Sequence, residues 1–290
     1  MKAPVKLVAL VLVPFLVGAC QESRNQQSVS AMTFNIRYAN PSDEIHVWEN
    51  RKDWVAEIIR ESEADVVGLQ EALRHQIDTL STRLPEYEWV GQGRSDGQNG
   101  GEFSPVFFRT DRLQLLETET FWLSPWPDSV GSVGWDAALP RIVTWASFEL
   151  KATGGTFLFF NTHFDHRGEG AREESAHLLR RKIMEIAGSR PFIVTGDFNT
   201  LDSQPPYSAL TSKTPFAPIL LDTRSAAVQS DMTTFRGFEV GLTESRTIDY
   251  IFHSEYFMAT SHEVLDESRK GSYPSDHLPV LVVLDRPDRP

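Results

Sequence analysis

Cysteine is almost absent from this sequence: Cys20 is the single cysteine among 290 residues. A chain with one thiol cannot close an internal disulfide, and it cannot build a zinc site from several thiolates. Basic residues are also scarce, 28 against 40 acidic ones, which gives a formal net charge of −12. That balance gives no sign of a broadly basic surface for nucleic acid, although it leaves a local basic groove open. Repeats, low-complexity blocks and a linker between two halves are lacking too, so we expect one main domain.

The N-terminal segment has the features of a signal peptide. Lys2 and Lys6 supply positive charge, residues 7–17 form an apolar run, and the segment ends "LVGAC" at residues 16–20. The run is short for a membrane-spanning helix and has the length of a signal-peptide core. The ending resembles a bacterial lipobox, whose cysteine is lipidated, so Cys20 is the expected lipidation site. An ordinary secretory signal with a chance cysteine is the alternative.

These features predict a division of the chain into three parts. Residues 1–20 are the expected lipoprotein signal peptide, and 21–30, "QESRNQQSVS", form a polar, flexible tether. Residues 31–285 are the expected domain. We therefore expect a protein of the cell envelope that meets the membrane through a lipid anchor at Cys20, at the outer membrane or the periplasmic side if the host is Gram-negative.

Apolar runs typical of buried strands occur along the domain, together with stripes of apolar residues at helical spacing. We expect strands at 31–38, 65–71, 103–109, 142–150, 156–164, 191–199, 247–253 and 278–284, and helices at 49–61, 73–84 and 172–187. The strands both alternate with helices and follow one another directly. This order favours sheets with helices on their outer faces over one doubly wound parallel sheet.

Glycine- and proline-rich stretches at 91–101 and 125–134 predict long loops on a rim. Trp122, Trp126 and Trp135 lie in or near these loops. Two interpretations of these tryptophans stay open: they pack the loops, or they form a platform that stacks on a base or sugar.

Short polar residues stand beside the apolar runs in a recurring pattern. They are Asn35, Glu71, His163, Asp197, Asn199, Asp249, Asp276 and His277. Taken singly, each has a structural explanation, since Asp and Asn after a strand commonly form turns or helix caps. Together they predict one site, because strands of a buried sheet end at a common edge.

The motifs that carry these residues resemble the endonuclease/exonuclease/phosphatase superfamily. They are, in chain order, "MTFNIR", "GLQE", "NTHFD", "TGDFN", "IDYIF" and "SDHLPV", and they extend from about residue 31 to residue 284. The resemblance implies an α+β fold, a four-layer α/β/β/α sandwich of two packed sheets flanked by helices, with the active site at one end. It implies a metal-dependent hydrolase acting on phosphoester bonds. The stretches "TFWLS" and "GWDAALPR" are similar to a bacterial secreted branch.

The resemblance also implies a metal site. Glu71 is the expected principal ligand, with Asn35 and Asp276 beside it directly or through water. Hard oxygen ligands of this kind suit Mg²⁺ or Mn²⁺.

Four further residues take catalytic roles by the same resemblance. Asp197 is expected to accept a proton from the attacking water, which Asn199 helps to hold. His277 is expected to donate to a phosphate oxygen, and Asp249 to bind its other ring nitrogen and fix its tautomer.

The stretch "NTHFDHRGEGAR" supplies the last expected site residues. His163 resembles a second phosphate-contacting histidine, which Glu102 would orient, and Arg141 resembles the arginine that holds the substrate phosphate. A zinc site built from His163, Asp165 and His166 is the alternative for this stretch.

These expectations combine into a Mg²⁺-dependent phosphoester hydrolase, monomeric and lipid-anchored outside the cytoplasm. Two alternatives stay open. One is a nuclease, since "WENRKDW" at residues 48–54 resembles the deadenylase branch; the other is a non-catalytic surface-binding lipoprotein. The acidic composition favours a small phosphoester or headgroup as the substrate over a long polyanion.

Overall fold

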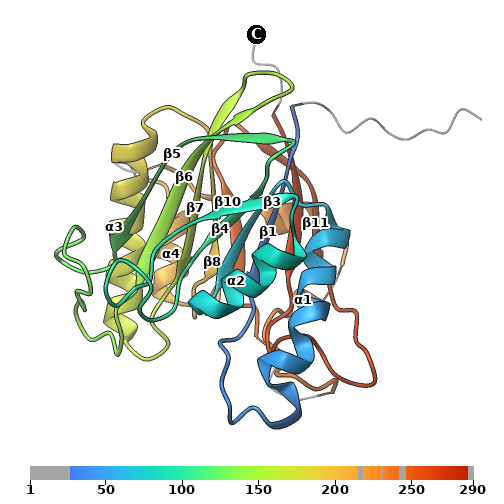
Figure 1. Ribbon diagram of the computed structural model, residues 1–290. Helices are drawn as coiled ribbons and strands as arrows, with labels where there is room; N and C mark the ends of the chain where they lie inside the picture. Colours follow the sequence, from blue (N-terminus) through green and yellow to red (C-terminus); the bar gives the residue numbers. More distant parts are fainter. Residues whose placement is uncertain (1–26, 215–217, 230, 242–245, 287–290) are drawn as a thin grey trace, which may run out of the picture.

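The computed structural model describes residues 27–214, 218–229, 231–241 and 246–286. Cys20, the expected signal peptide and most of the expected tether lie outside these residues. Two sheets face each other, and helices cover their outer surfaces (Figure 1). This is the four-layer sandwich expected from the sequence.

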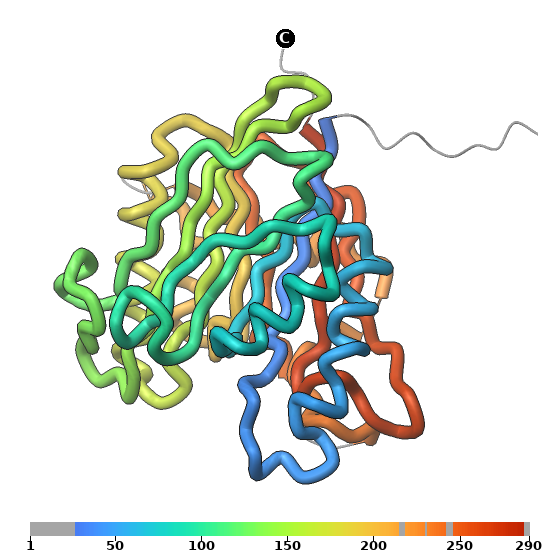
Figure 2. Tube along the Cα trace, in the orientation of Figure 1, coloured from blue at the N-terminus to red at the C-terminus, as the bar shows by residue number. Residues whose placement is uncertain are grey.

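The first sheet has six strands in the order β11-β12-β1-β2-β4-β3. Their bounds are β1 Val29–Asn35, β2 Val66–Gln70, β3 Tyr87–Val90, β4 Val106–Arg109, β11 Met258–Val264 and β12 Val280–Asp285. The two ends of the domain meet in this sheet, because β1 pairs with β12 in antiparallel register (Figure 2). The helices α1 (Trp48–Ser62) and α2 (Arg74–Arg83) cover its outer face.

The second sheet also has six strands, in the order β5-β6-β7-β8-β10-β9. Their bounds are β5 Leu113–Trp122, β6 Ile142–Leu150, β7 Thr156–His163, β8 Phe192–Asp197, β9 Leu221–Asp222 and β10 Asp249–His253. The helices α3 (Glu169–Ala187) and α4 (Pro205–Thr211) cover its outer face. Two short 3₁₀ helices, Glu44–His46 and Thr223–Ala226, complete the described elements.

Alternation along the strands builds the layers. In β1, Val29 and Ala31 pack in the core between the sheets, whereas Met32 and Phe34 pack under α1 and α2. Successive side chains of a strand point to opposite faces, so one strand serves two cores. β1 is buried along its whole length, and the apolar residues on both of its faces are the reason that the sequence predicted a strand here.

The core between the sheets becomes polar as it approaches the site. The Gln70 amide donates to Thr33 Oγ1 at 3.0 Å and to Asn161 Oδ1 at 2.7 Å, and Thr195 Oγ1 donates to Asn161 Oδ1 at 3.1 Å. These groups are fully buried, so their mutual hydrogen bonds offset the cost of desolvation. Gly68 makes room for this layer, because a Cβ there would lie 2.4 Å from Thr195 Oγ1.

Some boundaries differ from the sequence-based expectations. β1 begins at Val29, so Val29 and Ser30 belong to the sheet, where both are buried, and not to the tether. The helix expected at 172 begins three residues earlier, at Glu169. The rim stretches 91–101 and 125–134 are loops, as expected. Across the described part of the chain, no helix combines the length and apolar character needed to span a bilayer.

Candidate active site

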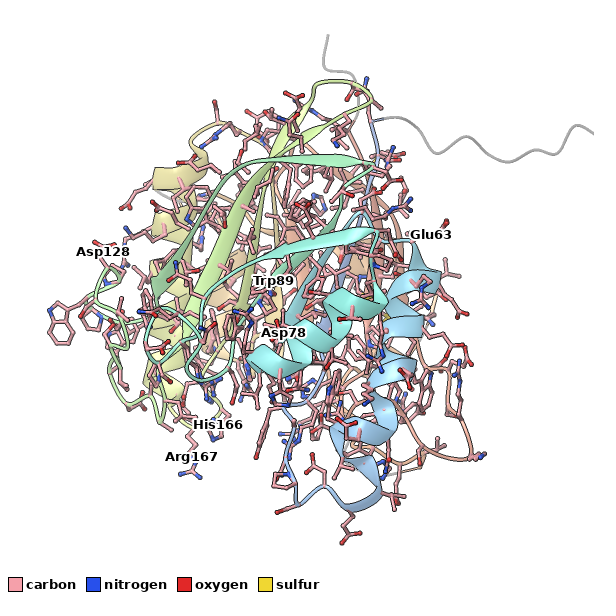
Figure 3. The ribbon with its side chains drawn as sticks, viewed as in Figure 1. Glu63, Asp78, Trp89, Asp128, His166 and Arg167 are labelled. Carbon is pink, nitrogen blue, oxygen red and sulfur yellow. The ribbon has the colours of Figure 1, made fainter. Side chains whose placement is uncertain are left out.

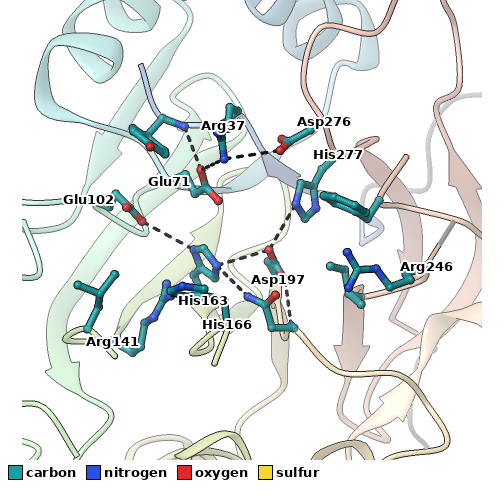
Figure 4. A pocket seen from close by; sticks show the side chains of 15 residues that line it. Arg37, Glu71, Glu102, Arg141, His163, His166, Asp197, Arg246, Asp276 and His277 are labelled. Carbon is teal, nitrogen blue, oxygen red and sulfur yellow. Dashed lines mark hydrogen bonds and ion pairs between the residues drawn. The ribbon is translucent and has the colours of Figure 1, made fainter. Parts of the chain in front are cut away.

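The expected site residues meet at one end of the sandwich, around a cavity of about 450 Å³ (Figure 4). Strand register brings three of them into a row: Asp197 on β8 pairs with His163 on β7 and with Asp249 on β10. The opposite sheet supplies Asn35, whose Nδ2 donates to Asp197 Oδ2 at 3.0 Å across the gap. All four side chains point between the sheets, at the edge where the apolar core ends.

Three residues around the cavity have left-handed backbone conformations. Their φ angles are 56° at Arg37, 61° at Glu71 and 47° at Asn199, each just beyond the end of a strand. Such angles are uncommon outside glycine and carry a local cost, and they recur at functional sites. Here they turn the side chains back toward the cavity.

Two carboxylates share one cation on the first-sheet side. Arg37 Nη1 lies 4.0 Å from Glu71 Oε2 and 3.7 Å from Asp276 Oδ2. The Glu71 carboxylate is further held by the backbone N–H of Tyr38 at 3.1 Å and by Asn35 Nδ2 at 3.2 Å. Burial, together with the charge of Glu71, raises the pKa of Asp276 above its ordinary value. Burial therefore disfavours the charged form of the Asp276 carboxyl, even with Arg37 beside it.

This donor set fits a hard divalent cation. Glu71 and Asp276 offer carboxylate oxygens toward the same point, and such oxygens are the ligands that Mg²⁺ and Mn²⁺ prefer. Asn35 presents its Nδ2 to the site, while its Oδ1 accepts from the Arg37 backbone N–H at 3.0 Å. In this arrangement Asn35 holds the Glu71 carboxylate, and its own ligation of a metal stays a prediction.

Asp197, Asp249 and His277 form a second cluster, whose ligand atoms lie within 4.8 Å of one another. Its hydrogen bonds indicate proton handling. His277 Nδ1 lies 2.9 Å from Asp249 Oδ2, which also accepts from Thr234 Oγ1 at 2.6 Å. Burial alone would lower the pKa of His277, but Asp249 and Asp197 outweigh it and raise the pKa to about 10. The ring is therefore an imidazolium at neutral pH, oriented by Asp249 as expected.

Asp197 is a carboxyl group that titrates near neutral pH. Its side chain is buried, and burial, reinforced by the charge of Asp249, raises its pKa to about 7. Asn199 donates its backbone N–H to Asp197 Oδ1 at 2.9 Å. A carboxylate with a pKa near the working pH is well suited to accept a proton from water.

His163 is neutral. Burial lowers its pKa well below 6.5, and the charges of Arg141 and Arg94 lower it further. Asn199 Nδ2 lies 3.1 Å from His163 Nε2, and since an amide nitrogen only donates, Nε2 accepts and Nδ1 carries the proton. The expected contact of His163 with a phosphate stays a prediction.

Glu102 lies on the Nδ1 side of His163, as expected, but its main partner is different. Its carboxylate forms a two-pronged pair with Arg94 at 2.8 and 2.9 Å. Glu102 Oε2 is 3.9 Å from His163 Nδ1, too far for a hydrogen bond. Arg94 was not among the residues expected from the sequence, because it lies in a glycine-rich loop without strand or helix periodicity.

Arg141 is buried and binds both Asp165 and His166, the "DH" of the stretch "NTHFDHRGEGAR". Its Nε donates to Asp165 Oδ2 at 3.3 Å, and its Nη2 lies 2.9 Å from His166 Nδ1. Asp165 Oδ1 accepts the backbone N–H groups of Arg167 and Gly168. The alternative zinc site is therefore not supported, because Asp165 and His166 direct their ligand atoms at the Arg141 guanidinium.

A second arginine that was not expected from the sequence connects two segments of the site through their backbone carbonyls. Arg51 on α1 is buried and donates to the carbonyls of Ile36, of Arg37 at 2.6 Å and of Pro274 at 3.3 Å. It thus links the segment after Asn35 to the segment before Asp276. The only sequence signal for it was the "WENRKDW" stretch.

The rim tryptophans separate into two kinds. Trp122 is buried and donates its Nε1–H to the Arg94 carbonyl at 2.8 Å, so it packs the loop. Trp126 and Trp135 are exposed. None of the three lines the cavity.

Comparison with known proteins agrees with this geometry. The sequence model of the Endonuclease/Exonuclease/phosphatase family matches residues 32–277. A solved endonuclease/exonuclease/phosphatase from Bacteroides vulgatus is 42% identical, with a TM-score of 0.83 over 90% of this chain and 99% of that one. A mannosyl-6-phosphatase from Bacteroides thetaiotaomicron is 39% identical, with a TM-score of 0.82 over 88% of this chain and 99% of that one.

A more distant curated relative is Nocturnin of Drosophila melanogaster. It is 24% identical over 281 residues, which are 82% of this chain and 42% of Nocturnin. The chain thus spans less than half the length of that relative.

Proposed function

Because the chain belongs to the endonuclease/exonuclease/phosphatase family, whose members hydrolyse phosphoesters, we propose that it is a Mg²⁺-dependent hydrolase of small phosphomonoesters. One observation carries the proposal. An imidazolium, His277, and a carboxylate with a pKa of about 7, Asp197, line one cavity with the two carboxylates Glu71 and Asp276. This arrangement supplies a proton acceptor, a charged donor and a cation site around one cavity.

The chemistry follows from these positions. Asp197 accepts a proton from water as the water oxygen bonds to phosphorus, and the ester P–O bond breaks. The departing oxygen takes up a proton from solvent, so the products are phosphate and an alcohol. His277 Nε2–H, which is not used by Asp249, donates to a phosphate oxygen as negative charge develops. Arg141 binds the phosphate from the opposite side of the cavity.

Glu71 and Asp276 would hold the metal ion. When bound, a divalent cation neutralises phosphate charge and favours attack on phosphorus. Arg37 shares these two carboxylates, so it sets the charge that the ion meets.

Two findings support a small substrate. The cavity volume is typical of sites for single small molecules. The relative named as a mannosyl-6-phosphatase aligns along nearly its whole length, which favours a sugar phosphate.

A panel of substrates tests the proposal directly. Sugar phosphates, a phosphodiester, single-stranded RNA and single-stranded DNA would be assayed with Mg²⁺ or Mn²⁺ and with chelator, across salt concentration. We expect turnover of a monoester that disappears with chelator and changes little with salt. Fast, salt-sensitive cleavage of a polymer with poor turnover of every small substrate would instead establish a nuclease.

We also propose that the protein is anchored through lipidated Cys20 at the cell envelope, on the strength of the lipobox-like sequence. Replacing Cys20 with serine should move the protein from the membrane fraction to the soluble fraction. Identical partitioning of parent and variant on detergent extraction would overturn the anchor.

A further inference from the structure

His166 lies outside the catalytic machinery described above, yet it contacts a residue that belongs to it. It follows β7 in the loop that leads into α3, at the end of the molecule where the site opens (Figures 3 and 4). Its side chain is exposed and lines the cavity, and its Nδ1 lies 2.9 Å from Nη2 of the buried Arg141.

The direction of this hydrogen bond fixes the state of the histidine. A guanidinium only donates, so His166 Nδ1 must accept and the ring proton lies on Nε2. Partial burial and the charge of Arg141 lower the pKa of His166, which keeps the ring neutral. A neutral ring is the form that can accept from Arg141.

The guanidinium is thereby held at two edges. Its Nε is bound by Asp165 and its Nη2 by His166, whereas the buried Nη1 has no hydrogen-bond partner among the described residues. A buried N–H without a partner is costly unless a ligand or water satisfies it. Arg141 is therefore arranged with unused donors beside the cavity.

The two residues that hold Arg141 differ in what else they do. Asp165 is buried and accepts the backbone N–H groups of Arg167 and Gly168, so it also builds the loop. Among the described residues, the His166 side chain has no hydrogen bond to the backbone, and it is exposed. The role of Asp165 in building the loop is enough to explain its presence. For His166, the hydrogen bond to Arg141 is the described contact that suggests a role.

We propose that His166 is a positioning residue for substrate phosphate: through Nδ1 it fixes the Arg141 guanidinium in the orientation that binds a phosphate group. This inference rests on the proposed function for the identity of the ligand. It predicts that loss of His166 weakens phosphate binding while leaving the chemical step almost unchanged, because Asp197 and His277 do not contact it.

The test compares three single variants in the full-length, Mg²⁺-loaded protein. His166→Ala removes the acceptor. His166→Asn places an amide oxygen close to the position of Nδ1 and keeps it. His75→Ala is the matched control, since His75 is an exposed histidine on α2 that does not line the cavity. Inorganic phosphate is the binding probe, measured by isothermal titration calorimetry, and steady-state kinetics on the best monoester supplies KM and kcat.

We expect His166→Ala to raise KM and the phosphate Kd by about tenfold, the effect of one lost hydrogen bond, with kcat changed less than about twofold. His166→Asn should restore most of the affinity, and His75→Ala should match the parent. Equal phosphate affinity in His166→Ala and His75→Ala, or a loss confined to kcat, would overturn the inference.

The same data separate this inference from the proposed function. If no monoester is turned over but phosphate binding follows the predicted order of variants, the proposed function fails and the positioning role stands. If monoesters are turned over and His166→Ala behaves as the parent, the positioning role fails alone.

Discussion

Two buried histidines face the same oxygen atom, but one is positively charged and the other is neutral. His277 Nε2 lies 3.7 Å from Asp197 Oδ2, and His163 Nε2 lies 3.5 Å from it. Burial lowers the pKa of both rings, yet the pKa of His277 ends at about 10 and that of His163 well below 6.5. Depth in the protein therefore does not set the charge of a site histidine.

The far nitrogen of each ring explains the difference. His277 Nδ1 has the carboxylate of Asp249 at 2.9 Å, with no cation between them. His163 Nδ1 faces Glu102 at 3.9 Å, and Arg94 already neutralises that carboxylate. One site thus contains an imidazolium suited to donate and an imidazole suited to accept.

Substitution of Asp197, whose Oδ2 lies between the two rings, should have the largest effect on kcat. Asp197→Asn keeps the size of the side chain and removes the proton acceptor, so kcat should fall by about a hundredfold or more. In the parent, Asp197 is ionised only above its pKa of about 7, so kcat should decline as the pH falls through 7. Single-turnover rates across pH measure both, and a parent profile that stays flat from pH 5 to 8 would contradict the assignment.

Removing each histidine tests the asymmetry itself. His277→Ala should cost about 3 kcal/mol of transition-state stabilisation, more than a hundredfold in kcat, because a charged donor is lost. His163→Ala should cost roughly tenfold, since a neutral acceptor contributes less. Equal losses in the two variants would show that the difference in charge has no catalytic consequence.

Asp249→Asn should make His277 resemble His163. Without the carboxylate the pKa of His277 falls, so its charged form is lost at lower pH. On the alkaline side, activity of the parent should decline as the pH rises through about 10, and in the variant this alkaline limb should move toward neutrality. We expect roughly a tenfold loss at pH 8 and a smaller loss at pH 7, and an unmoved alkaline limb would exclude Asp249 as the cause of the raised pKa.

Glu102→Gln should have the smallest effect. The carboxylate is paired with Arg94 and only approaches His163, so we expect kcat to change by about threefold or less. Thermal unfolding of the same variant reports the loss of the Arg94 pair separately. A loss of kcat as large as that of His163→Ala, without a change in melting temperature, would show that Glu102 orients His163 after all.

Strand interiors and the residues at their ends were the most predictable parts of this molecule. β6 spans Ile142–Leu150, as expected, because a strand buried on both faces is rich in apolar residues. Asn35 and Asp197 could be placed together because polar residues that end buried strands share one edge of the fold.

Elements with little buried surface could not be predicted. β5 contains the polar run Glu117–Glu119, in which both glutamates are exposed, so its sequence lacks the apolar signal. β9 has two residues, and β11 is mostly exposed. Their strand character comes from pairing with neighbours, which a single sequence does not contain.

Contacts between loops were the least predictable part of the site. Arg94, Arg141 and His166 come from three segments, and their mutual geometry depends on how the rim folds. The sequence provided a role for Arg141 by resemblance, but neither of the groups that hold it. For Glu102 the sequence predicted a position near His163, which is correct, but its main partner is Arg94.

The course of β1 has a consequence for how the enzyme would work at a surface. The strand starts at Val29, at the end of the sandwich where the preceding chain enters, and finishes at Asn35 beside the cavity (Figure 1). Seven residues of strand span about 20 Å. Any attachment through the preceding segment would therefore join the domain at the end of β1 that is far from the cavity, so the mouth of the cavity would not lie at the point of attachment.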